Sequence, residues 1–326
     1  MKQRSSNQGR SASYRSLASR IALVILLSTV SAVLSHAEVI YNSIPKKLPG
    51  NEFSVAFEGA GVSEFGDIIA FKPGNRGNLV SVKVILSSWA CQIGNASSGN
   101  CVTHPGRAIF THPITLNIYK VSSQSLMPGG PPGTLLATIT QKFNIPYRPS
   151  ADSRCTGTNA GKWYDSQDKA CYNGIATPIV FDQVNPPTTL PDTVIFGIAY
   201  NTSLYGSTPI GKSPSCYSTL AGCPYDSLNV SAEGNGGLTG KVLDQNGIFL
   251  NISYSDPKCP IPVLGQFRLD TSSVYGCSWL DYHPQIQFID KNGENNSDGS
   301  EKDAFKDSAS SDNGRDRGRS NRLSDK

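Results

Sequence analysis

The sequence is poor in charged residues, histidine and methionine. Charged residues make up 17% of the 326 positions, and there are four histidines and two methionines against 31 glycines and 21 prolines. This composition favours a loop-rich globular protein over a helical one. A zinc site is also disfavoured, because no Cys-x-x-Cys is present and only His104, His112 and His283 follow residue 37.

The main part of the chain also lacks an excess of positive charge. The net charge is +4, yet the first 37 residues alone carry five cations and no acid, namely Lys2, Arg4, Arg10, Arg15 and Arg20. A nucleic-acid-binding protein concentrates Lys and Arg on its folded domain. The charge distribution therefore argues against a nucleic-acid partner.

The basic N-terminal segment is typical of a secretory signal peptide. Its cations precede an apolar run from Ile21 to Leu34, and the small residues Ser35 and Ala37 follow. This pattern predicts a signal peptide over residues 1–37, cleaved after Ala37. The alternative is an uncleaved anchor, but the run has 14 residues, whereas a spanning helix needs about 20. No later stretch is apolar enough to span a membrane, so we expect a secreted or cell-surface protein.

All the cysteines follow the predicted cleavage point. The eight residues are Cys91, Cys101, Cys155, Cys171, Cys216, Cys223, Cys259 and Cys277. An even number of cysteines in an exported chain indicates disulfides. They form sequential pairs 10, 16, 7 and 18 residues apart, each around a stretch rich in Gly, Ser, Asn or Pro. The spacing therefore predicts four local disulfides, each closing one surface loop.

Alternating apolar residues begin at Phe53, and no convincing helical period appears before the C-terminal tail. The clearest alternating runs are Val80–Leu86, Ile114–Tyr119, Leu135–Thr140, Val194–Tyr200 and Ile286–Phe288. Further strand candidates are Phe53–Phe57, Asp67–Phe71, Thr177–Phe181, Gly247–Ile252 and Gly265–Leu269. About ten short strands with turn signals between them predict an all-β, antiparallel sandwich, and the long connections favour a jelly roll with disulfide-clipped loops.

The domain boundaries follow from composition. Residues 38–52 are predicted to be an extended lead-in, 53–290 a single β-sandwich domain and 291–326 a disordered mixed-charge tail. Two turns support the strand assignment: Gly129–Gly133 separates two alternating runs, and Asn246-Gly247 predicts a hairpin.

One segment matches a phosphate-binding motif in form only. Gly206–Ser213 satisfies G-x-x-x-x-G-K-[ST], which requires a strand before it and a helix after it. Pro214 follows at once and no helical periodicity lies downstream. An ordinary turn is the better interpretation, and we expect neither a nucleotide nor any other cofactor.

Catalytic chemistry has one candidate, a pair of carboxylates that would cleave a glycosidic bond. The acids available are Glu58, Glu64, Asp67, Asp165, Asp168 and Asp281. Turn caps and salt-bridge partners are the simpler interpretation, and the sequence contains neither G-x-S-x-G nor H-E-x-x-H. We assign no catalytic residue and no metal ligand.

Aromatic residues in the predicted loops are the candidate ligand-binding residues. Trp163 is followed by Tyr164, and Trp279 lies close to Tyr282. Flat rings beside polar side chains suit the apolar C–H faces and polar rim of a sugar. The alternative is that these rings fold inward as small satellite cores.

Several segments resemble a group of uncharacterised bacterial exported β-sandwich proteins. The resemblance covers about residues 40–290 and rests on Ser63–Asp67, Ser87–Cys91, His112–Tyr119, Pro132–Thr138 and Ala199–Ser203. It implies a layout similar to jelly-roll surface or carbohydrate-binding modules and assigns no functional residue. We therefore expect a non-catalytic surface or binding module that binds polysaccharide weakly. The alternatives are a structural cell-surface protein without a small ligand and a secreted glycan-cleaving hydrolase.

Overall fold

The computed structural model describes residues 37–74, 77–94, 96, 98–104, 108–182, 188–201, 228–232, 238–253, 263–271, 279–280 and 282–291. The predicted signal sequence up to residue 36, the charged tail from residue 292 and Gly206–Ser213 lie outside the described residues. So do Cys216, Cys223, Cys259 and Cys277.

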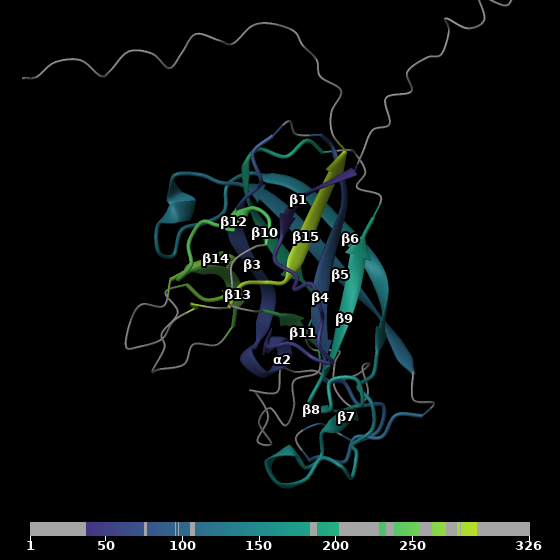
Figure 1. Cartoon of the computed structure of the whole chain (residues 1–326). Helices are drawn as coiled ribbons and strands as arrows, with labels where there is room; N and C mark the ends of the chain where they lie inside the picture. The colour runs from purple at the N-terminus through teal and green to yellow at the C-terminus, as the bar shows by residue number, and fades with distance from the viewer. Residues whose placement is uncertain are drawn as a thin grey trace, which may run out of the picture. The chain divides into compact units, whose positions relative to one another are not determined.

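The described residues form antiparallel sheets, which confirms the prediction of an all-β sandwich (Figure 1). The six-stranded sheet has the order β1-β15-β4-β11-β2, with β9 paired to β4. Its strands are β1 (Ala37–Asn42), β2 (Ser54–Val55), β4 (Leu79–Ser88), β9 (Ile175–Phe181), β11 (Leu228–Ser231) and β15 (Ile286–Lys291). The finer prediction of a jelly roll stays a prediction.

The seven-stranded sheet has the order β14-β13-β3-β10-β5-β6, with β12 paired to β3. Its strands are β3 (Val62–Ala70), β5 (Ile109–Lys120), β6 (Leu135–Pro146), β10 (Thr193–Ala199), β12 (Lys241–Val242), β13 (Ile248–Ile252) and β14 (Arg268–Asp270). The predicted turn at Gly129–Gly133 does join two paired strands, β5 and β6. The helical elements are single turns: α2 (Phe57–Ala60), η1 (Gln124–Leu126) and η2 (Gly157–Asn159).

One hydrophobic core lies between these two sheets. Leu116 and Ile118 of β5 face it, while Asn117 between them is partly exposed. This alternation is what period-2 patterning requires of a sheet with one buried face. Rings from the two sheets meet directly, with Phe196 and Phe288 at 5.7 Å between centroids. A smaller cluster that includes Ile68 and Ile195 lies apart from this core.

The predicted lead-in is part of the sandwich. Residues 37–42 form β1, which pairs with β15, and Ile40 and Tyr41 are buried in the core. The sequence prediction missed this strand because its apolar residues, Val39, Ile40 and Tyr41, run consecutively instead of alternating.

The prediction that the strands on either side of Asn246-Gly247 pair as a hairpin is wrong. β12 and β13 lie on either side of this turn, but both pair with β3 instead of with each other. Neither β12 nor β13 is in register with Asp67 or Ile68 of β3. The Ile68 N–H of β3 therefore finds a side-chain acceptor, the Asp67 carboxylate, at 2.6 Å.

Two of the four predicted disulfides are confirmed. Cys91 pairs with Cys101 and Cys155 pairs with Cys171, with Cα atoms 5.3 and 5.9 Å apart. The second disulfide joins β8 to the loop that precedes β7 (Trp163–Asp165). β7 and β8 (Ala170–Tyr172) form a small two-stranded sheet close to the start of β9 (Figure 1).

Candidate functional site

Trp163 and Tyr164 lie in β7, where neighbouring residues cover their rings. Trp163 is only 8% exposed, and its indole Nε1–H donates to the Gly174 carbonyl at 2.5 Å. Its ring packs against Tyr172 at 5.6 Å. The guanidinium of Arg154 lies 4.0 Å from the centre of the Tyr164 ring. Burial leaves Trp163 little ring surface for the sugar contact that the sequence suggested.

Asp168 binds two residues of the lead-in, Lys47 and Gly50, to the hairpin formed by β7 and β8. Its carboxylate accepts hydrogen bonds from the Gly50 N–H at 2.8 Å and the Tyr172 hydroxyl at 3.1 Å, and it forms an ion pair with Lys47. The Lys47 ammonium, followed by the Gly50 N–H, lowers the pKa of Asp168. A carboxylate engaged by three donors serves the structure, which agrees with the simpler interpretation of this acid.

Trp279 and Tyr282 form a turn with part of its aromatic surface in solvent. The Tyr282 N–H donates to the Trp279 carbonyl at 2.9 Å, and the rings meet edge to face at 5.8 Å. Both rings are partly buried against the main core. The Trp279 indole N–H donates to the Asp270 carboxylate at 2.9 Å, which fixes the orientation of that ring.

Phe53 completes this group from a distant part of the sequence. Its ring lies 5.4 Å from that of Tyr282, edge to face, and it is 63% exposed. We call Phe53, Trp279 and Tyr282 the aromatic surface. The sequence prediction assigned Phe53 only as the first residue of a strand, because nothing in the local pattern shows that its ring meets Tyr282.

Glu64 and Asp67 face opposite sides of the seven-stranded sheet. Asp67 is in register with Phe196 of β10 and faces the main core, whereas Glu64 faces away from it. The Glu64 Oε1 accepts from the Asn117 amide at 2.9 Å and the Tyr119 hydroxyl at 3.2 Å. Burial raises the pKa of Glu64. Since a glycosidase needs two carboxyl groups in one groove, these two acids do not form its catalytic pair.

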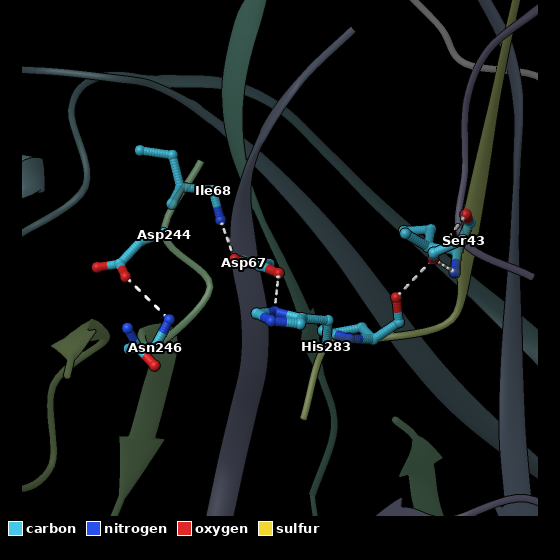
Figure 2. A network of polar contacts seen from close by, with 8 residues as sticks. Ser43, Asp67, Ile68, Asp244, Asn246 and His283 are labelled. Carbon is cyan, nitrogen blue, oxygen red and sulfur yellow. Dashed lines mark hydrogen bonds and ion pairs between the residues drawn. The ribbon is translucent and has the colours of Figure 1, made fainter. Parts of the chain in front are cut away.

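Asp67 forms a buried pair with His283 (Figure 2). Asp67 Oδ2 lies 2.7 Å from His283 Nδ1, and the side chains are 1% and 4% exposed. The pair spans the sandwich, because Asp67 belongs to β3 and His283 precedes β15. Burial raises the pKa of Asp67 to about 6, against the opposing effect of the His283 hydrogen bond. With so little exposure, the pair has no access to a substrate.

Arg148 is a further buried charged residue that the sequence did not reveal. It is fully buried, and its Nη2 donates to the Gly161 carbonyl at 2.7 Å. Its main chain joins the first disulfide loop, since the Arg148 N–H donates to Ala90 and the Thr103 hydroxyl donates to the Arg148 carbonyl. Burial lowers the pKa of Arg148 to about 10. Arg148 thus connects the loops that carry the two disulfides.

The remaining candidate acids, Glu58, Asp165 and Asp281, lie in different parts of the chain. Glu58 is buried in α2, and Asp165 accepts from the Gln167 N–H at 2.7 Å in the β7–β8 turn. Asp281 lies outside the described residues. No cluster of His, Cys, Asp and Glu able to hold a metal ion, and no helix able to span a membrane, occurs among the described residues.

Comparison with known proteins gives no relative. No family model, no curated protein and no solved structure matches this chain.

Proposed function

We propose that this protein is an exported, non-catalytic binding module that binds polysaccharide weakly through the aromatic surface. The observation that carries the proposal is the exposed Phe53 ring, 63% exposed and in edge-to-face contact with Tyr282. A large ring held in place at the surface is the kind of group that stacks on the apolar face of a sugar. Trp279 extends the same group of rings.

Contacts within the protein orient Trp279 and Tyr282 before any ligand binds. Trp279 is oriented by its bond to Asp270, and Tyr282 lies between Trp279 and Phe53. Immobilising a side chain on binding costs about 0.5–1.5 kcal/mol. Rings that are already ordered avoid part of this cost, which favours binding even through a small contact.

The expected affinity is low. Ring contacts contribute about 0.5–1.5 kcal/mol each beyond buried area, so two or three stacking faces with a few hydrogen bonds reach about −4 kcal/mol, or a Kd near 1 mM per site. Repeating sugar units would raise retention on an insoluble polymer, because a module that dissociates meets many equivalent sites nearby.

An extracellular location supports the same function. The two disulfides among the described residues are compatible with an extracellular protein. The basic and apolar N-terminal sequence is the pattern of a secretory signal. A module exported in this way meets cell-wall and extracellular polysaccharides.

A retention assay on a panel of insoluble polysaccharides tests the proposal. We expect the protein without residues 1–37 to be retained on at least one polymer, and Phe53→Ala and Trp279→Ala to lose most of that retention. Ile109→Ala is the matched control, since Ile109 is 53% exposed on β5. Equal retention of Phe53→Ala and the unaltered chain would exclude the aromatic surface as the site. Absence of retention on every polymer would favour a structural role without a small ligand.

A further inference from the structure

Arg148 lies where two segments of the chain pack against each other. Its main-chain N–H donates to the Ala90 carbonyl at 2.9 Å, and its carbonyl accepts from the Thr103 hydroxyl at 2.7 Å. We call residues 90–103 and 148–162 the disulfide junction, because they carry cysteines of both described disulfides. Hydrogen bonds at the Arg148 main chain therefore hold the two segments together.

The side chain of Arg148 is enclosed inside this junction. It is 0% exposed, and its Nη2 donates to the Gly161 carbonyl at 2.7 Å. Its Nε donates to the Pro149 carbonyl at 3.3 Å. A Cβ atom at Gly161 would overlap the Gly99 Cα atom, so no side chain separates the two segments at that point. The guanidinium is therefore surrounded by protein, and both of its acceptors among the described residues are main-chain carbonyls.

One end of the guanidinium has donors without an acceptor. An arginine side chain has five N–H groups, and Nη1 carries two of them. Nη1 of Arg148 is buried, and no atom of the described residues accepts a hydrogen bond from it. Leaving a buried charged donor unsatisfied costs more than leaving a neutral one. This position therefore fits a hydrogen-bond acceptor that is not part of the described chain.

The buried guanidinium keeps its positive charge at neutral pH. Burial lowers the pKa of Arg148, but only to about 10. Carbonyl oxygens accept hydrogen bonds from the cation without neutralising its charge. Charged groups in protein interiors are paired with an opposite charge, because an unpaired one is strongly destabilising. A water molecule at Nη1 would supply an acceptor but no negative charge, so an anion fits this position better.

The junction has no free carboxylate to pair with Arg148. Residues 90–107 contain neither Asp nor Glu, and Asp152 is the one acid of residues 148–162. Both oxygens of Asp152 accept from Arg154, from Nε–H at 2.9 Å and from Nη2–H at 2.6 Å. The exposed arginine thus takes the carboxylate, and among the described residues the buried one has no partner of opposite charge.

We propose that Arg148 binds a small monovalent anion such as chloride at its Nη1, inside the disulfide junction. One negative charge balances the guanidinium, and the anion accepts the free N–H groups in charge-assisted hydrogen bonds. Complete burial of Arg148 limits the site to a single small ion and excludes an extended acidic ligand. The bound anion stabilises the contact between the loops of the two disulfides. The site shares no residue with the aromatic surface, and the proposal does not depend on polysaccharide binding.

Urea denaturation of the mature chain at two chloride concentrations tests the proposal. Gluconate, a larger monovalent anion, keeps the ionic strength constant, because screening alone changes the strength of exposed ion pairs. For an ion that binds only the folded chain with a Kd of about 10 mM, we expect the unfolding equilibrium constant to fall about tenfold between about 1 and about 100 mM chloride. An unfolding equilibrium constant that does not depend on chloride would overturn the proposal.

Arg148→Met and Arg268→Met form a matched pair of variants. Methionine keeps an unbranched side chain without charge, so Arg148→Met should abolish the chloride dependence. Arg268 also donates to uncharged oxygens, those of Phe267 and Gln266, but it is partly exposed. Water therefore solvates its charge, and we expect Arg268→Met to keep the full chloride dependence. Loss of the dependence in Arg268→Met, or its persistence in Arg148→Met, would overturn the role of Arg148.

A crystal grown with bromide in place of chloride covers the case in which Arg148→Met does not fold. Bromide scatters anomalously, so we expect an anomalous peak in hydrogen-bonding contact with Arg148 Nη1 in the unaltered chain. An ordered water without anomalous signal at this position, or no density there, would overturn the proposal.

Discussion

Trp163 and Trp279 both donate the indole N–H to a nearby acceptor, yet one ring is enclosed and the other belongs to a surface cluster. Trp163 donates to the main-chain carbonyl of Gly174, whereas Trp279 donates to the side-chain carboxylate of Asp270. The Trp163 ring is 8% exposed. The Trp279 ring connects through Tyr282 to the exposed Phe53.

The difference comes from what folds over each ring. The lead-in packs tightly on the β7–β8 hairpin, because a Cβ atom at Gly50 would overlap the Tyr172 ring and the Asp165 carboxylate. The Cys155–Cys171 disulfide closes the same hairpin. At the aromatic surface, by contrast, Phe53 remains mostly in solvent. Similar residues therefore form a small core in one region and a binding candidate in the other.

Trp163→Ala is the strongest test of the difference between the enclosed Trp163 ring and the Trp279 ring of the surface cluster. We expect this change to lower the free energy of unfolding by about 3–5 kcal/mol, because it leaves a cavity and removes a buried hydrogen bond. Chemical denaturation of the unaltered and altered chains measures the difference. A loss below about 1 kcal/mol would mean that the ring is not enclosed as described.

Removing the Cys155–Cys171 disulfide should have the next largest effect on the free energy of unfolding. Replacing Cys155 and Cys171 together by Ser opens a loop with a sequence separation of 16. Chain entropy predicts a loss of about 3 kcal/mol. The fluorescence of Trp163 should shift to longer wavelength as water reaches the hairpin, while polysaccharide retention persists. Loss of retention in the folded double variant would show that the two regions are coupled.

Asp67, which contacts the aromatic turn through His283, should make stability depend on pH near neutrality. The pKa of Asp67 is raised from 3.8 to about 6, so its proton stabilises the folded state at low pH, and this contribution is lost as the pH rises through about 6. At about 1.4 kcal/mol per pKa unit, the loss is no more than about 3 kcal/mol. Denaturation of the unaltered chain and Asp67→Asn at pH 5 and pH 7.5 isolates this contribution. The same slope in both chains would contradict it.

Much of the fold follows from the sequence because its strands alternate. The run around Ile114 predicts β5, and the run around Val194 predicts β10, since one face of each strand meets the core. Local cysteine spacing likewise predicts the two disulfides that the structure describes. β1 escapes this reasoning because its apolar residues run consecutively, and β7 because it spans only Trp163–Asp165.

The candidate site depends on contacts that no local pattern contains. Phe53 and Tyr282 are 229 positions apart in sequence, and Asp67 and His283 are 216 apart. Glu64 and Asp67 look like one acidic cluster along the chain. The pleat of β3 places them on opposite faces, because residues three apart in a strand point in opposite directions. The partners of Phe53, Glu64 and Asp67 are therefore set by strand pairing and by packing between segments that are distant in sequence.

The smallest expected effect on stability is that of Phe53→Ala, and it gives the sharpest contrast with Trp163→Ala. The Phe53 ring is 63% exposed, so removing it costs little burial, and its edge contact with Tyr282 is the main interaction lost. Its main-chain bond, from the Ala232 N–H to the Phe53 carbonyl at 2.8 Å, survives the substitution. We expect the free energy of unfolding to fall by about 0.5–1 kcal/mol, the size of one aromatic contact. Denaturation and polysaccharide retention should be measured on the same sample, because an exposed binding ring affects the second and hardly the first. A loss of 3 kcal/mol or more would place Phe53 with the core residues and remove the distinction between the two aromatic regions.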